Sequence, residues 1–440
     1  MTFDPFKEKP GKLEAFESRD RVYPRAYDKN ATDPYTKVRI ILMNGTEFES
    51  QWFLHNMARH VTNEDLRREI AVTRRIEQQQ QKTISYLKPK DESILEHTIG
   101  YEQLAVDLTA IMARCEPDKY VRGALDFALL EDFDHLYRYA DLLESDMGVR
   151  AERLVGKYTE IMPGRPTISE HRYPKDDVRR HMDARTASLR TKLHAMIITA
   201  AEQQTMNYYM NQGSFYDMSE VGRKLYMEIA MIEEQHVSLY ESLIDSSLTW
   251  AECMLMHEYT ECYLYWSMMT DECDEYVKKI WTRHLEQEIA HLHNAARLLE
   301  KYEGKHWSEV IPDGAMPDPL LFGEASDANK AYIRKLLAHT VENTAYGDGW
   351  SDLSEVPSSS EFFKYNAKVN GAVADVASHK IIDRYIMEAG EDYRFQEREH
   401  PVRELRDRTH DNVDMGRVRR DGGTETPATR RTSGKSRSRT

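Results

Sequence analysis

Three sets of residues in this chain repeat one arrangement of side chains that could bind a metal. In each set, a single glutamate is followed 30 or 31 residues later by an acid-x-x-His motif, in which an acidic residue precedes a histidine by three positions. The sets are Glu102 with Asp132 and His135, Glu202 with Glu233 and His236, and Glu258 with Glu288 and His291. Carboxylates and imidazoles suit ions such as manganese and iron. The repetition therefore points to acids and histidines that meet at one place.

The spacing of these residues fits helical hairpins. Residues three apart on a helix share a face, so the acid and the histidine of one motif can hold the same ion. About thirty residues carry the chain along the rest of one helix, around a turn and back to the same height on an antiparallel partner. Two such hairpins facing each other would present four carboxylates and two imidazoles, which is enough for a pair of ions.

An acid-x-x-His motif alone is weak evidence, because 17 histidines and 75 acids among 440 residues give about three such motifs by chance. Glu272, Glu303 and His306 even have the longer spacing, but Gly304 interrupts that helix. The three candidate sets lie instead within apolar helical stripes. A bare carboxylate buried there would cost several kcal/mol, so a bound metal is the best explanation. A hydrogen-bonded polar core without metal is the alternative.

The elements that must position these residues are long helices. Only 20 glycines and 15 prolines occur in the chain, which argues against an all-β sandwich. Periodicity predicts helices over about 63–87, 91–114, 118–147, 177–211, 215–245, 248–269, 272–303 and 361–390. Thr249 and Glu252 have capping-box spacing, and Gly304 marks a helix end. Residues 38–45 could form a short strand or part of a helix entry.

These elements suggest four regions along the chain. They are an N-terminal arm and helix (1–90), a helical bundle with a third hairpin (91–303), a C-terminal helical extension (304–390) and a charged, disordered tail (391–440). We expect the extension to shape or cover a pocket in the bundle.

The order Glu102, Asp132-x-x-His135, Glu202, Glu233-x-x-His236 resembles the ferritin-like di-iron carboxylate superfamily over about residues 91–245. The resemblance implies an all-α fold, a ferritin-like four-helix bundle with an additional hairpin and N- and C-terminal helical extensions. It also implies that these six residues bind two iron ions, with manganese as an alternative, and that Asp132 and Glu233 bridge them. Asp132 stands where many members have glutamate, and its shorter side chain could change the metal spacing.

By the same likeness, the protein would be a non-haem di-metal oxidoreductase that activates dioxygen or peroxide. The expected form is an oxygenase, such as a monooxygenase, or an oxidase that acts on a small organic substrate with an external electron donor. Dimanganese catalase-like or rubrerythrin-like peroxide detoxification is an alternative, and so is a metal-free helical scaffold. No general acid or base stands out beyond the metal ligands.

Three further residue groups have competing interpretations. Tyr139 and Tyr240 each follow a candidate ligand histidine by four residues, so they could be redox-active or simply core residues. Glu258, Glu288 and His291 could form a second site, pair with the second hairpin, be relics of duplication, or form a hydrogen-bonded cluster. The four cysteines form no C-x-x-C pair, which predicts buried thiols and no rubredoxin-like module.

Charge and hydropathy limit the kinds of partner that the protein is expected to bind. The net charge is −15, and an acidic body argues against broad nucleic-acid binding, although residues 417–440 contain eight basic and two acidic residues. The first residues show no apolar signal-peptide core, and no apolar run approaches the roughly 18 residues that span a bilayer. We therefore expect a soluble cytoplasmic protein with no membrane partner, forming a homo-oligomer.

Overall fold

The computed structural model describes residues 3–161, 171–337, 357, 359–369, 417–418 and 424–425. Across these residues the protein is helical, apart from strands β1 (Arg417–Val418) and β2 (Thr424–Glu425), which pair antiparallel. This confirms the predicted all-α class. The last predicted helix is present as α14 (Glu361–Val369). Its expected continuation to residue 390 and most of the tail at 391–440 lie outside the described residues.

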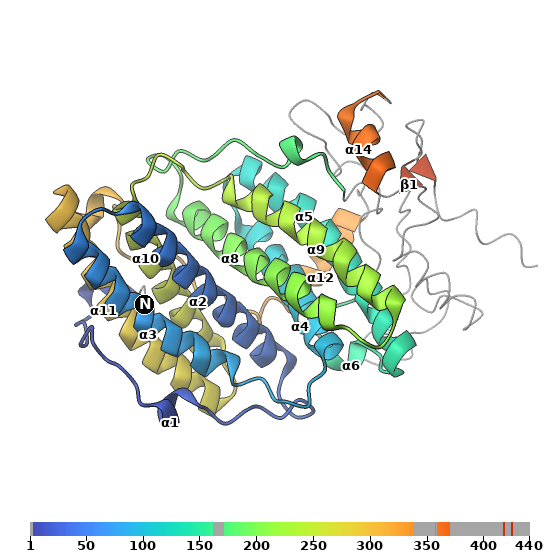
Figure 1. Cartoon of the computed structure of the whole chain (residues 1–440), viewed down its shortest axis with the longest axis horizontal. Coiled ribbons are helices and arrows are strands. Elements are labelled where there is room, and N and C mark those ends of the chain that lie inside the picture. Colours follow the sequence, from blue (N-terminus) through green and yellow to red (C-terminus); the bar gives the residue numbers. More distant parts are fainter. Residues whose placement is uncertain are drawn as a thin grey trace, which may run out of the picture.

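Eight long helices of the described residues form four hairpins (Figure 1). They are α2 (Pro34–His60) with α3 (Glu64–Ser85), α4 (Ile94–Cys115) with α5 (Lys119–Met147), α8 (Leu189–Gln212) with α9 (Glu220–Glu241), and α10 (Trp250–Asp271) with α11 (Glu275–Glu303). The first hairpin is one more than the sequence predicted, because residues 38–45 lie inside α2. Helix α8 starts at Leu189, later than the expected residue 177. The Ser188 hydroxyl caps this start by accepting a hydrogen bond from the backbone N–H of Thr191.

Shorter elements connect and flank these hairpins. They are η1 (Pro5–Lys7), α1 (Arg19–Val22), α6 (Glu152–Val155), η2 (Pro174–Asp176), η3 (Gly213–Phe215), η4 (Trp307–Glu309) and α12 (Ser326–Leu337). Helix α12 packs on α4 and α5, and its buried Asn329 donates a hydrogen bond to the Asp107 carbonyl oxygen. None of the described helices combines the length and apolar character that a membrane crossing requires.

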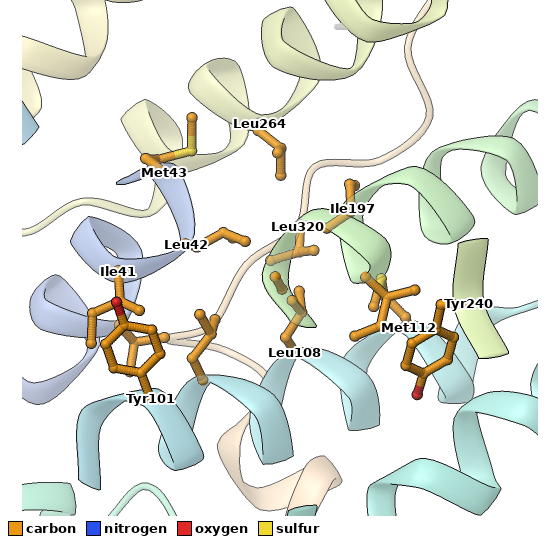
Figure 2. Close-up of a cluster of buried hydrophobic side chains, with 14 of the residues drawn as sticks. Ile41, Leu42, Met43, Tyr101, Leu108, Met112, Ile197, Tyr240, Leu264 and Leu320 are labelled. Atoms are coloured by element: carbon orange, nitrogen blue, oxygen red, sulfur yellow. The ribbon is translucent and has the colours of Figure 1, made fainter. Parts of the chain in front are cut away.

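The hairpins assemble into two four-helix bundles that lie side by side (Figure 1). The first bundle consists of α4, α5, α8 and α9, and the second bundle of α2, α3, α10 and α11. Helix α2 packs against α4 and α8, and so joins the two bundles. Figure 2 shows the apolar side chains at this junction, which include Leu42 of α2, Leu108 of α4, Ile197 of α8 and Leu264 of α10.

The helices repeat along the chain with a shift of 156 residues. Helices α4 and α10 both have 22 residues, α5 and α11 both have 29, and α3 and α9 both have 22. The capping boxes at Ser93 and Thr249 correspond, which confirms the capping box predicted at Thr249. Gly148 and Gly304 correspond too, and both end their helix in the left-handed conformation that glycine adopts without strain.

The repeated unit is therefore a run of four helices, α2–α5 and again α8–α11. The two units exchange hairpins. Each bundle combines one hairpin from the first unit with one from the second, so the first bundle takes α4–α5 and α8–α9 while the second takes the outer pairs. This exchange decides which acids and histidines can face one another.

Candidate metal centres

The six predicted ligand residues of the first two sets lie together in the middle of the first bundle. Each of its four helices contributes at the same height: Glu102 from α4, Asp132 and His135 from α5, Glu202 from α8, and Glu233 and His236 from α9. All six side chains are at most 1% exposed. We call this group the first centre.

His236 faces three carboxylates of the first centre. Its Nδ1 atom lies 3.2 Å from Asp132 Oδ1, 3.3 Å from Glu233 Oε2 and 3.7 Å from Glu202 Oε2. The Nδ1 atom of His135 lies 2.9 Å from the other oxygen of Glu233, and the two imidazole rings are 5.9 Å apart. Glu233 thus lies between the two histidines.

Donor atoms of the first centre form two groups, each compact enough for one ion. One group is Asp132, Glu202, Glu233 and His236, and the other is Glu102, His135 and Glu233, with the donor atoms of each group within 4.8 Å of one another. Glu233 belongs to both, as expected for a bridging carboxylate. Asp132 belongs to one group only, so its predicted bridging role stays a prediction.

Eight buried polar atoms of the first centre have no hydrogen-bond partner. They are Glu102 Oε2, both oxygens of Asp132, both oxygens of Glu202, Glu233 Oε2, His135 Nε2 and His236 Nδ1. A buried polar atom without a partner costs about 1–3 kcal/mol. Carboxylate oxygens and imidazole nitrogens are the donors that divalent first-row metals take, so the residues present fit a pair of such ions.

The electrostatics of the first centre also fit bound cations. Burial beside Glu202 raises the pKa of Asp132 to about 7, and burial beside Glu233 raises the pKa of Glu102 well above its usual value. Burial alone would lower the pKa of His236, but Asp132 and other carboxylates outweigh it and raise that pKa well above normal. Protons therefore balance the crowded acids in the metal-free chain, and metal ions could replace those protons.

Two side chains that support the first centre were not predicted. Glu131 Oε2 lies 2.7 Å from His236 Nε2, and the Tyr209 hydroxyl donates a hydrogen bond to Glu102 Oε1. Tyr209 follows Glu202 by seven residues, which is two helical turns on the same face, so its position could have been recognised. Glu131 precedes a ligand directly, and nothing in its spacing distinguishes it from other acids.

The two tyrosines with a predicted redox interpretation are both completely buried near the first centre. Tyr139 stacks at a tilt against Tyr209, with ring centroids 5.3 Å apart, and the Tyr240 ring lies 6.5 Å from the His236 ring. Neither hydroxyl has a hydrogen-bond partner. Their redox role stays a prediction.

No family model, curated protein or solved structure matches the chain.

The third set lies in the second bundle and faces the hairpin α2–α3, which the sequence did not predict. Glu258, Glu288 and His291 point toward Glu47 of α2 and Glu77 of α3. The alternative pairing of this set with the second hairpin is therefore wrong, because α8–α9 already packs on α4–α5. Glu47 and Glu77 are 30 residues apart and so repeat the hairpin spacing, but Gln80 occupies the place of the histidine.

Glu272, Glu303 and His306, which have the hairpin spacing but are separated by Gly304, do not come together in the structure. Helix α11 ends at Glu303, with Gly304 as its cap, and His306 caps the separate turn η4 instead. Glu303 accepts a hydrogen bond from the Thr249 hydroxyl at 2.7 Å. Glu303 is therefore a suitable control for substitutions in the first centre.

Proposed function

We propose that this chain is a non-haem di-metal oxidoreductase that reacts with dioxygen or peroxide through the first centre, within a ferritin-like bundle. The proposed cofactor is a pair of iron ions, with manganese as the alternative. Its electrons would come from an external donor. As the resemblance implies, the proposed form is an oxygenase or oxidase acting on a small organic substrate.

One observation carries this proposal, the convergence of eight buried, unpartnered donor atoms from six residues on four helices. A metal-free scaffold would leave these atoms with only the ion-pair contacts of His236 Nδ1 to neighbouring carboxylates, whereas two ions would use all of them. Bound iron would supply the redox electrons and the Lewis acidity for the reaction with the oxidant.

The protein residues have separate tasks in this proposal. Glu131 accepts the proton of His236 Nε2, which directs the Nδ1 lone pair toward the carboxylates when the imidazole is neutral. Tyr209 holds Glu102 through its hydroxyl. The apolar faces of the four helices exclude water, which strengthens every electrostatic interaction inside the bundle.

Peroxide detoxification is the second candidate, and the deep burial of the first centre favours it. A molecule as small as peroxide or dioxygen needs the least rearrangement to reach ligands that are at most 1% exposed.

Metal analysis of full-length variants tests the proposal. In protein expressed with iron and manganese both supplied, Glu233→Ala should contain about two fewer metal ions per chain than the wild type, because Glu233 belongs to both donor groups. His236→Ala should contain at least about one fewer, because His236 belongs to one group. Glu303→Ala, outside the first centre, should lose none. The same two variants should lose consumption of dioxygen or peroxide.

The identity of the metal then separates the candidate reactions. Bound iron would support the reaction with dioxygen. Bound manganese would support the catalase-like breakdown of peroxide. Wild-type metal content in both Glu233→Ala and His236→Ala would overturn the assignment of the first centre.

A further inference from the structure

The second bundle carries a group of buried acids at the same positions as the ligands of the first centre. The shift of 156 residues relates Glu258 to Glu102, Glu288 to Asp132, His291 to His135, Glu77 to Glu233 and Gln80 to His236, and a shift of 155 residues between α2 and α8 relates Glu47 to Glu202. Five of these six positions thus keep an acid or a histidine. We call this group, together with Glu261, the second centre.

The donor atoms of the second centre again form two groups that share one carboxylate. Glu77, Glu258 and His291 make one group, and Glu258, Glu261 and Glu288 make the other, each with donor atoms within 4.8 Å of one another. His291 Nδ1 lies 3.1 Å from Glu288 Oε2 and 3.7 Å from Glu258 Oε2. Glu258 is therefore the carboxylate that can bridge two ions.

Buried carboxylate oxygens of the second centre lack hydrogen-bond partners. Both oxygens of Glu77, both oxygens of Glu261, Glu258 Oε2 and Glu47 Oε2 have none. All four side chains are at most 1% exposed. An unpartnered ionised carboxylate buried to this degree is unfavourable unless a cation lies beside it.

When the carboxylates of the second centre are ionised, their charge favours more than one cation. Five carboxylates lie in the second centre with one histidine, and Arg74 of α3 is a further cation that acts on Glu77. A single divalent ion would leave most of this negative charge uncompensated. Two ions bridged by Glu258 compensate it far better.

At two positions the second centre has different residues from the first centre. These differences give the second centre more oxygen donor atoms and fewer nitrogen donor atoms. The amide nitrogen of Gln80 donates a hydrogen bond to Glu288 Oε1, so Gln80 holds a carboxylate where His236 offers a nitrogen. Glu261 occupies the position of Ala105 and adds a carboxylate. The Tyr265 hydroxyl donates to Glu47 Oε1, as Tyr209 does to Glu102 in the first centre.

We propose that the second centre binds a second pair of divalent cations, bridged by Glu258, and that it prefers a hard ion such as Mn²⁺. Sites made mainly of carboxylates suit manganese and magnesium, whereas more imidazole suits iron. This pair does not depend on the function proposed for the first centre, since it has its own ligands in the other bundle.

The test uses the full-length chain with the first centre disabled by Glu233→Ala and His236→Ala together. After incubation with Mn²⁺ and dialysis, this variant should keep about two manganese ions per chain, with the electron paramagnetic resonance signal of a coupled pair. Adding Glu258→Gln or Glu261→Gln, which preserve the shape of the side chain, should lower bound manganese at least twofold. Glu286→Gln, an exposed acid on α11, should leave it unchanged.

About one ion or none in the variant that lacks the first centre would overturn the proposed pair. Manganese that persists in both Glu258→Gln and Glu261→Gln would overturn its assignment to these residues. In either case, loss of metal on substitution of Glu233 in the otherwise wild-type chain would still support the first centre, so the two proposals fail separately. Circular dichroism of each variant shows whether a loss of metal is a loss of fold.

Discussion

His236 is a candidate ligand with a further carboxylate behind its imidazole ring. Its Nε2 atom lies 2.7 Å from Glu131, while its Nδ1 atom faces the carboxylates of the first centre. A carboxylate behind a ligand histidine fixes its tautomer and makes the imidazole a better donor. The repeat has Gln287 at the position that corresponds to Glu131, so this support belongs to the first centre alone.

Glu131→Gln should therefore weaken metal binding at the first centre by about 10–100-fold, the usual effect of removing such a partner. Competition with a chelator of known affinity measures the change. The matched control is Glu234→Gln, which removes the same charge from an exposed position on α9. Unchanged affinity in Glu131→Gln, with the control also unchanged, would show that Glu131 does not position His236.

At the scale of elements, the contact between α2 and α8 holds the two bundles together. Gln204 of α8 lies against Gly45 of α2, and its amide nitrogen donates a hydrogen bond to the Ile41 carbonyl oxygen at 2.8 Å. A β-carbon at position 45 would come within 2.7 Å of that nitrogen and 3.0 Å of Gln204 Cβ. The helices can approach this closely only because residue 45 is glycine.

Gly45→Ala should consequently destabilise the protein by about 1–3 kcal/mol, because overpacking outweighs the better helix propensity of alanine. Gly123→Ala on α5 is the matched change, since nothing lies within 4 Å of a β-carbon there. It should stabilise the protein by about 0.5–1 kcal/mol. Urea unfolding measures both, and equal stabilisation by the two substitutions would contradict the close α2–α8 contact.

Helix α2 is the long helix that the sequence did not predict. Val38, Ile40, Ile41, Leu42 and Met43 are all at most 3% exposed, because α2 packs against both bundles. A helix buried on most of its surface has no polar face and hence no helical periodicity in its sequence. A short continuous apolar run of this kind is as typical of a buried strand as of a helix. The amphipathic helices α3, α9 and α11, which expose one face, were predicted to within a few residues.

For the whole molecule, the exchange of hairpins makes the two halves of the chain depend on each other. Each bundle, and with it each centre, takes one hairpin from each half. Residues 1–161 and 162–440, produced as separate chains in one cell, should therefore associate in a one-to-one complex that binds metal. Affinity purification through a tag on one half, followed by light scattering, measures the association. Two halves that fold, bind metal and stay apart would show that each repeat can close on itself.

The sequence by itself determined the local features of this protein. Periodicity, capping residues and helix-ending glycines define most helices, and the spacing of about 30 residues places an acid opposite an acid-x-x-His motif within each hairpin. These features depend on residues close together in the chain, so local geometry is enough to predict them. The six ligand candidates of the first centre, which the structure brings together, were found in this way.

Only the tertiary structure decided which hairpins face each other. All four hairpins offer an apolar face with acids at mid-height, so the local pattern does not discriminate among their pairings. The pairing of α2–α3 with α10–α11 comes from long-range packing around α2, α4 and α8, between segments more than 150 residues apart. This packing turns Glu47 and Glu77, two acids without a histidine, into neighbours of Glu258 and His291.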